Sequence, residues 1–425
     1  MHEDSPSLSM SNGIGAREAA PTQAAVPAGL PEGVRCLRGR DSQGAHYLIA
    51  IPAQWSGVLV MHAHGGPPLG EAQAARADAD VQRWAVMLQQ GHAWAGSVFR
   101  DSGFAVLPAA QDTERVRRVF VEHVATPKRT VLHGQSWGAL VAAKAAALFP
   151  QSWDGLLLSS GAVGGLLAYD FRVDLRAIYQ YLCNNHPAPG EPAYPLSIGL
   201  PKDDPLTKAQ LAARVNEALG VRLPAAQRSA EQARRLRTLV NVLKITEEGV
   251  ADQLRWATFT LRDVVAKHGG SPFGNENVRY VGSDDDAALN AGVARYRADP
   301  VARARFTAQS DYEGRFPMPV LTVHGIHDPT CFVEVHDTLR QRMRDAGCAH
   351  RLVQTFVNSD QHSYLGDAIY PPLVEALLDW IDGGRAPTPQ WIAERSRAQY
   401  SLPRGEADFV PDYVPRALTT RIHPR

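Results

Sequence analysis

The sequence contains little cysteine and no excess of either charge. Only four cysteines occur in 425 residues, at positions 36, 183, 331 and 348. Because they are far apart and form no Cys-x-x-Cys motif, they indicate neither a zinc site nor a dense disulfide framework, although they leave room for one or two bridges. Lys and Arg together number 44, as do Asp and Glu. A basic surface for phosphate backbones is therefore not expected, and we predict no nucleic-acid partner.

Long hydrophobic runs are also lacking. No apolar segment is long enough to span a bilayer, and residues 1–25 contain no apolar run that could form the core of a signal peptide. We therefore expect a cytoplasmic protein, or an exported one if a signal was removed before residue 1. The composition, 44% hydrophobic and 21% charged, is that of an ordinary globular protein with two or three structural units.

The most informative stretch that is present is Gly134-Gln135-Ser136-Trp137-Gly138. The apolar residues 130–132 before it predict a buried strand, and the small residues 139–147 after it predict a helix packed closely on a sheet. So abrupt a change from strand to helix strains the central residue, and the glycines on both sides leave room for it. We predict that the Ser136 hydroxyl stands clear of the sheet at a helix N-terminus, as a nucleophile would.

Strand and helix patterns alternate around this motif, which predicts an α/β fold with a mostly parallel sheet and helices on both faces. The expected strands cover residues 34–38, 46–51, 57–62, 93–98, 130–132, 154–161, 319–325 and 352–357. Two of the expected helices cover residues 80–89 and 111–124. We divide the chain into a disordered tail (1–30), an α/β core (31–161 and 318–386), a mainly helical cap (162–317) and an extended tail (387–425).

The cap is expected to be helical because the alternation of strands and helices stops and helix signals take over. Thr207 and Gln210 form a capping box, and Gly220 ends the helix that it begins. Several cap residues are candidates for a substrate pocket, although the more common reading of such residues is cap core. They are Arg255, Trp256, Phe259, Tyr169, Phe171, Tyr179 and Tyr181.

A glycine-rich loop, His64-Gly65-Gly66-Pro67-Pro68, follows the expected strand 57–62. An ester or amide attacked by Ser136 develops an oxyanion, which needs two preorganised hydrogen-bond donors. The Trp137 N–H, directly after the nucleophile, would be one donor. The second would be the N–H of Gly66 or Gly65, because the two prolines carry none.

The same loop contains an H-x-H pair, His62 and His64, which would be an alternative metal site. No H-E-x-x-H motif and no following Asp-His pair occur, so we expect no metal and interpret His62 as a packed histidine.

A base and an acid for Ser136 are found after two later strands. Asp328 follows the strand 319–325, and His362 follows the strand 352–357. Because catalytic groups gather at the carboxyl ends of parallel strands, we expect these three side chains to meet, with His362 as base and Asp328 orienting it. Alternatives stay open: Asp170, Asp174 and Asp360 for the acid, and His324 and His327 for the base.

On these residues the chain resembles the α/β-hydrolase superfamily, over about residues 34–384. The resemblance rests on His64-Gly65-Gly66, Gly134-Gln135-Ser136-Trp137-Gly138, His324-Gly325-Ile326-His327-Asp328 and Gln361-His362. It implies an eight-stranded, mostly parallel sheet with a cap inserted before the acid-bearing strand. It also implies hydrolysis through an acyl-enzyme on Ser136, without a cofactor.

Three functions are compatible with these residues. The leading prediction is a serine hydrolase of small-molecule carboxylic esters, and residues 152–155 resemble tannase and feruloyl-esterase-type members. The second is hydrolysis of short peptides or amides, since His64-Gly65-Gly66-Pro67 and Ser-Trp-Gly resemble proline iminopeptidases, although Pro68 breaks their Gly-Gly-Pro-Gly loop. The third is a non-catalytic binding protein with a hydrolase fold. The oligomeric state is left open.

Overall fold

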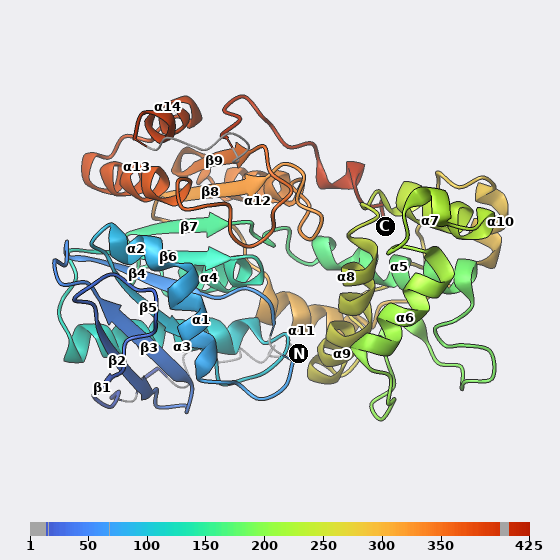
Figure 1. Cartoon of the computed structure of the whole chain (residues 1–425), viewed down its shortest axis with the longest axis horizontal. Helices are drawn as coiled ribbons and strands as arrows, with labels where there is room; N and C mark the ends of the chain where they lie inside the picture. The colour runs from blue at the N-terminus through green and yellow to red at the C-terminus, as the bar shows by residue number, and fades with distance from the viewer. Residues whose placement is uncertain (1–13, 16, 68, 400–407) are drawn as a thin grey trace, which may run out of the picture.

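The computed structural model describes residues 14–15, 17–67, 69–399 and 408–425, with one nine-stranded sheet at its centre (Figure 1). The strand order is β1-β2-β3-β5-β4-β6-β7-β8-β9. The pairs β1–β2, β2–β3 and β3–β5 are antiparallel and all later pairs are parallel. The strands are β1 Thr22–Ala24, β2 Arg35–Arg40, β3 His46–Ile51, β4 Val58–Ala63, β5 Ala93–Ser97, β6 Arg129–Gln135, β7 Gly155–Ser159, β8 Val320–Gly325 and β9 Leu352–Val357.

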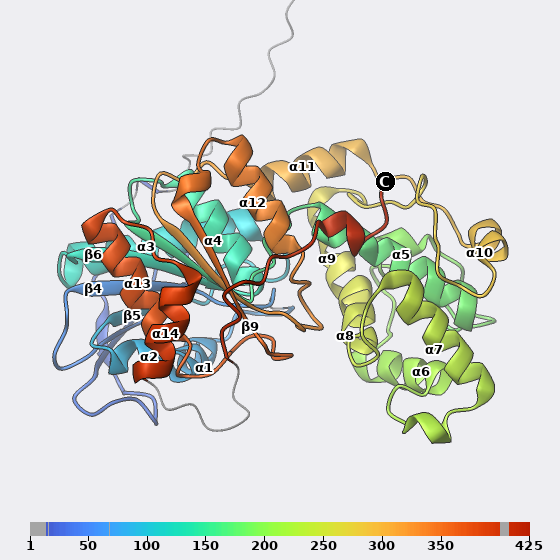
Figure 2. The ribbon, with the colours of Figure 1, turned by 90° about the horizontal axis from the view of Figure 1, so that it is seen from above.

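Helices cover both faces of the sheet, which explains why the central strands read as continuous apolar runs. They are α1 Ala75–Arg83, α2 Ala85–Gln89, α3 Val106–His123, α4 Trp137–Leu148, α12 Val335–Asp345 and α13 Tyr370–Gly383. Figure 2 shows α1, α2 and α13 on one side of the sheet and α3, α4 and α12 on the other. In β6, Leu132 joins the apolar cluster of α3, α4 and α12, whereas its neighbour Val131 joins the cluster of α1, α2 and α13.

Residues 162–317, between β7 and β8, form helices that lie beside the sheet (Figure 1). These are α5 Leu167–Cys183, α6 Lys208–Leu219, α7 Ala230–Leu243, α8 Val250–Arg255, a π-helical turn Trp256–Thr260, α9 Leu261–His268, α10 Asp286–Gly292 and α11 Pro300–Ser310, with short 3-10 turns at Leu196–Ile198 and Ala225–Gln227. The predicted capping box is confirmed, since the Thr207 hydroxyl accepts from the Gln210 N–H at 3.2 Å. Gly220 ends α6 in the left-handed conformation, also as predicted.

Both predicted tails contain regular structure that the sequence analysis missed. β1 lies within the tail 1–30, so the sheet has nine strands rather than the predicted eight. Residues 1–13 and 16 of this tail lie outside the described part. It is three residues long and pairs through its backbone, so it leaves no hydrophobic period to detect. In the tail 387–425, α14 Pro389–Gln399 forms because Pro389 begins it and Ile392 is buried. Residues 408–425 are largely extended, with a 3-10 turn at Leu418–Thr420.

Two predicted helices also have different bounds. The helix expected over 80–89 is divided at Trp84 into α1 and α2, and α3 begins at Val106 rather than Gln111.

None of the helices in the described ranges combines the length and apolar character needed to cross a bilayer. All four cysteines are free thiols.

Candidate active site

Ser136 occupies a strained turn between β6 and α4. Its backbone has φ 56° and ψ −123°, outside the regions that L-residues normally adopt. Hydrogen bonds on both sides hold this geometry: the Ser136 N–H donates to the Ser159 carbonyl at 3.0 Å, and the Ser136 carbonyl accepts from the N–H of Ala139 and of Ala162, both at 3.0 Å. The turn is therefore fixed by its neighbours before any substrate binds.

The glycines around Ser136 are required by close packing. A Cβ at Gly134 would lie 2.5 Å from the Gly138 carbonyl oxygen, and a Cβ at Gly138 would lie 2.1 Å from the Ala63 carbonyl oxygen. On the opposite side, a Cβ at Gly65 would lie 3.0 Å from the Ser136 Cβ. The loop after β4 is thus pressed against the turn that carries the serine.

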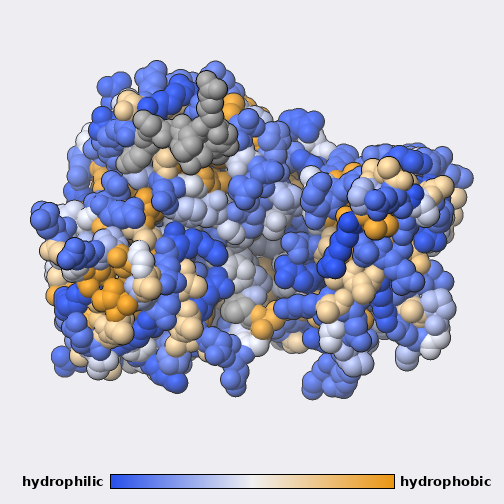
Figure 3. All heavy atoms as spheres, in the orientation of Figure 1, coloured by the Kyte–Doolittle hydropathy of each residue, from blue (hydrophilic) through white to orange (hydrophobic). Residues whose placement is uncertain are grey.

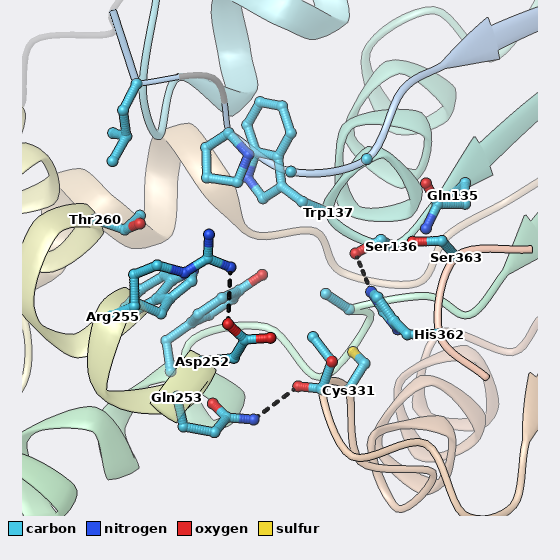
Figure 4. A pocket seen from close by; sticks show the side chains of 18 of the residues that line it. Gln135, Ser136, Trp137, Asp252, Gln253, Arg255, Thr260, Cys331, His362 and Ser363 are labelled. Atoms are coloured by element: carbon cyan, nitrogen blue, oxygen red, sulfur yellow. Dashed lines mark hydrogen bonds and ion pairs between the residues drawn. The ribbon is translucent and has the colours of Figure 1, made fainter. Parts of the chain in front are cut away.

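The structure brings Ser136, His362 and Asp328 together in one chain of hydrogen bonds. The Ser136 Oγ lies 2.7 Å from the His362 Nε2 (Figure 4), and the His362 Nδ1 lies 2.7 Å from the Asp328 Oδ2. The second Asp328 oxygen accepts from the N–H groups of Thr330 and Cys331 at 2.8 and 3.0 Å. The Asp328 side chain is buried, so these bonds replace water as the partners of its charge.

The alternative acids are engaged elsewhere. Asp170 and Asp174 lie on α5, where Asp170 pairs with Arg303 at 3.2 Å and Asp174 pairs with Arg425 at 2.6 Å. Asp360 accepts from the side-chain amide of its neighbour Gln361. Of the candidate acids, Asp328 is the one bonded to His362.

The alternative bases are also engaged elsewhere. His327 bonds to the Asn358 side chain at 3.1 Å. His324 is fully buried behind the acid, with its Nε2 2.8 Å from the Cys331 carbonyl oxygen and 3.4 Å from the Asp328 Oδ2. Its Nδ1 bonds to His336 at 2.9 Å, and burial lowers the pKa of His324. His324 and His336 therefore form a neutral pair that packs behind the acid, and the sequence analysis did not foresee this pair.

The expected oxyanion donors lie around Ser136. Trp137 is the first residue of α4, and Gly65 and Gly66 line the same cavity as Ser136. Within the described residues, the backbone N–H groups of these three residues donate to no protein acceptor. The Gly65 carbonyl accepts from Arg76 at 2.8 Å, which anchors the loop. Backbone N–H groups without a protein acceptor thus occur on both the turn and the loop that line the cavity.

His62 and His64 are packed, as expected for His62. His62 lies between Trp84 and Trp94, with ring centroids at 5.3 and 5.7 Å, and its Nδ1 bonds to His133 at 3.0 Å. His64 donates to the Gly65 carbonyl and stacks on Phe99. The part of the chain that the structure describes holds no cluster of three or more His, Cys, Asp or Glu side chains suited to a metal ion.

A cavity of about 490 Å³ lies in front of Ser136, between the sheet and the helices of residues 162–317. Figure 3 shows the surface hollowed between these two parts. In Figure 4, Asp252, Gln253 and Arg255 of α8 lie across the cavity from Ser136 and His362. The residues of 162–317 that were considered for a pocket divide into three groups: Tyr169, Arg255 and Trp256 line the cavity, Phe171, Tyr179 and Phe259 are buried in the core, and Tyr181 is exposed.

Strand order and turn geometry together decide the fold. A parallel sheet carries a serine on a strained strand-to-helix turn, and the Ser, Asp and His of the hydrogen-bonded chain follow in that sequence order at the ends of β6, β8 and β9. The chain has the α/β-hydrolase fold.

No model of a known protein family matches the chain, and no curated protein does. An esterase from Aspergillus oryzae aligns at 13% identity over 87% of this chain and 86% of its own, with a TM-score of 0.43. Candida antarctica lipase A aligns at 12% identity over 88% and 83%, with a TM-score of 0.44. The rice cell wall degrading esterase LipA from Xanthomonas oryzae aligns at 13% identity over 87% and 99%, with a TM-score of 0.43. Each similarity is low, so the assignment of this α/β-hydrolase fold rests on the chain's own strands and turn.

Proposed function

We propose that this protein hydrolyses carboxylic esters through an acyl-enzyme on Ser136. The observation that supports this most directly is the unbroken chain of hydrogen bonds from the Ser136 Oγ through His362 to the buried Asp328. Such a chain lets an imidazole take the serine proton while a carboxylate holds the ring in the required tautomer.

The proposed reaction needs groups of this chain and one water molecule. His362 takes the proton from the Ser136 Oγ as that oxygen attacks the ester carbonyl, and the oxyanion accepts from the N–H of Trp137 and of Gly66 or Gly65. The C–O bond to the alcohol breaks, and His362 returns its proton to the departing alcohol. Water, deprotonated by His362, then attacks the acyl-enzyme; the bond between the acyl carbon and the Ser136 Oγ breaks, the acid leaves, and His362 returns its proton to the Ser136 Oγ. Asp328 stabilises the imidazolium in both halves of the reaction.

We also propose that residues 162–317 act as a cap over this site. Tyr169 of α5 and Trp256, at the π-helical turn after α8, line the cavity opposite the turn of Ser136. The side chains that select the substrate therefore come from the helices, whereas the reacting groups come from the ends of the strands.

Cleavage of peptides from a free amino terminus is less well supported by the cavity. It would require a carboxylate free to bind the ammonium group. The two carboxylates that line the cavity are paired already, Asp80 with Arg76 at 2.9 Å and Asp252 with Arg255 at 3.1 Å.

A serine-directed probe tests the proposed nucleophile. Wild-type protein should react with a fluorophosphonate at Ser136 and hydrolyse p-nitrophenyl acyl esters faster than aminoacyl p-nitroanilides. Ser136→Ala should lose labelling and lower kcat on the order of 10⁶-fold, because the attacking oxygen is gone. Ser363→Ala is the matched control, since Ser363 lines the same cavity and its hydroxyl, within the described residues, makes no hydrogen bond to the His362 ring. Ester hydrolysis retained by Ser136→Ala would rule out this mechanism.

A further inference from the structure

The charge of the cavity wall is strongly one-sided. Among the described residues, the cavity is lined by five cationic side chains and two carboxylates: Arg76, Arg83, Arg172, Lys208 and Arg255 against Asp80 and Asp252. Arg76 and Arg255 are paired with the two carboxylates. Within the described residues, Arg83, Arg172 and Lys208 form no ion pair, and of these three only Arg172 is buried.

Arg172 is a cation buried without a counter-ion. The residue is 7% exposed and lies on α5, where its guanidinium packs over the rings of Phe171 at 4.1 Å, Trp256 at 4.6 Å and Tyr169 at 5.4 Å. Its Nη1 donates to the Ala168 carbonyl, and this is the guanidinium's one hydrogen bond within the described residues. Nε is buried without a partner. Burial lowers the pKa of Arg172 to about 10, so the group stays charged at neutral pH.

A neighbouring arginine shows what a structural role looks like in this helix. Arg176 lies one turn later on α5 and is fully buried, and its Nε, like that of Arg172, has no hydrogen-bond partner in the described structure. Its guanidinium donates to three oxygens, of Tyr194 at 3.0 Å, Gly199 at 2.9 Å and Thr258 at 3.4 Å, and Arg176 does not line the cavity. Arg172 has one such acceptor among the described residues, the Ala168 carbonyl, and lines the cavity in front of Ser136. Because a buried charge is costly unless it is paired, an acceptor from outside the protein is the natural partner of Arg172.

A second donor without a partner lies beside it. Tyr169 also lines the cavity, and its hydroxyl is buried with no hydrogen-bond partner in the described structure. Burial raises the pKa of Tyr169, so the hydroxyl stays protonated and able to donate. A planar fork of N–H donors with a hydroxyl one turn away on the same helix is suited to a carboxylate, which offers two oxygens in one plane.

We propose that Arg172, assisted by Tyr169, binds a carboxylate of the substrate, so that this enzyme prefers esters that carry a free carboxylate group. The predicted preference in rate rests on the proposed ester hydrolysis. The carboxylate site itself does not depend on that reaction. Arg172 is here a residue that sets specificity, since it binds the substrate away from the bond that breaks.

Matched esters test the preference. Mono-p-nitrophenyl adipate and p-nitrophenyl hexanoate have acyl chains of equal length and differ in the terminal carboxylate. 4-Hexanoyloxybenzoate and its methyl ester place the same difference on the alcohol side. In at least one pair, wild-type protein should give a higher kcat/KM for the anionic ester. Arg172→Met, which keeps an unbranched stem up to the position of Nε but removes the charged fork, should lower the anionic-to-neutral ratio of kcat/KM about 10- to 100-fold, mainly through KM. Arg172→Lys should restore part of the ratio, because it keeps the charge and loses the fork.

Arg255→Met is the matched control. It removes one cationic charge from the same cavity, but that charge is already paired with Asp252. Its anionic-to-neutral ratio of kcat/KM should stay within about threefold of wild type. If the net charge of the cavity alone set the preference, Arg255→Met would lower this ratio as much as Arg172→Met does. A purely structural role of Arg172 would lower both members of each pair equally, and that result would overturn the proposal.

Binding of adipate keeps the proposal separate from the chemistry and from folding of the variants. Calorimetry with Ser136→Ala protein should show that adipate binds more tightly than the neutral adipamide. The added Arg172→Met substitution should remove this difference in affinity. If no ester is hydrolysed but this difference is found, the proposed reaction fails and the carboxylate site stands. If neutral esters are hydrolysed and no anion is preferred or bound, the carboxylate site fails alone. If Arg172→Met does not fold, the wild-type ester ratios and the adipate and adipamide affinities of Ser136→Ala decide.

Discussion

Two buried histidines, His62 and His133, are hydrogen-bonded to each other in the sheet beneath the site. His133 is fully buried, bonded through its Nδ1 to His62 and through its Nε2 to Ser159 at 2.9 Å. Burial lowers the pKa of His133 to about 3, and it also lowers the pKa of His62. Both rings are therefore neutral in the folded protein across the ordinary range of pH.

This has a consequence for stability in acid. The unfolded chain binds a proton at His133 below pH 6.5, whereas the folded chain does so only near pH 3, so stability is lost as the pH falls through this interval. Between pH 7 and pH 5 the loss from one such histidine is about 2 kcal/mol. In urea unfolding, the free energy of unfolding of wild type should fall between pH 7 and pH 5. The corresponding fall in His133→Asn should be smaller by about 2 kcal/mol.

His350→Asn provides the control for that measurement, since it removes a histidine that is exposed. Its difference between the two pH values should equal that of wild type. An unchanged pH difference in His133→Asn would contradict the assignment of His133 as a neutral, buried group.

Among the elements, the turn between β6 and α4 depends most on its glycines. A side chain at Gly138 would meet the backbone of Ala63 in β4, which cannot move without disturbing the sheet. Gly138→Ala should therefore displace Ser136 and lower kcat on ester substrates about 10²-fold. Gly383→Ala is the control, because nothing lies within 4 Å of a Cβ at this position in α13. Wild-type kcat in Gly138→Ala would show that the turn tolerates the added atom.

The same turn shows what sequence can and cannot predict. Ser136 and its strand and helix were predicted because every signal lies within a few residues. Asp328 and His362 were predicted because strand ends meet at one edge of a parallel sheet, although the 2.7 Å contacts needed coordinates. β1 was missed because three residues that pair through their backbone leave no pattern. Arg172 was missed because an arginine in an amphipathic helix is usually exposed, and only packing shows that it is buried.

On the scale of the whole molecule, the final residues connect the sheet to the helices of residues 162–317. Phe409 bridges to Val357 of β9, and further along the His423 Nε2 donates to the Val242 carbonyl of α7 at 2.7 Å. Arg425 then pairs with Asp174, which is buried on α5. Burial raises the pKa of Asp174, and the charge of Arg425 opposes that rise.

Removal of this cation should leave a buried carboxylate without its partner. We expect Arg425→Gln to lower the free energy of unfolding by about 3 kcal/mol in guanidinium titrations at neutral pH. Arg416→Gln is the control: Arg416 is exposed and 3.7 Å from Glu334, so its loss should cost less than about 1 kcal/mol. Equal effects of the two substitutions would show that the Arg425 pair contributes no more than a surface ion pair.

The helical part is joined to the sheet at more than its two covalent connections. The Lys144 Nζ of α4 donates to the carbonyls of Ala308 and Asp311 at 2.6 and 2.9 Å, which fastens α11 to the layer under the sheet. Residues 408–425 add a third passage of the chain from the sheet to these helices. We expect these contacts to oppose an outward swing of the helices about a single hinge. A cavity mouth of nearly constant width is the expected consequence, so that fixed side chains set the size of the molecules that enter.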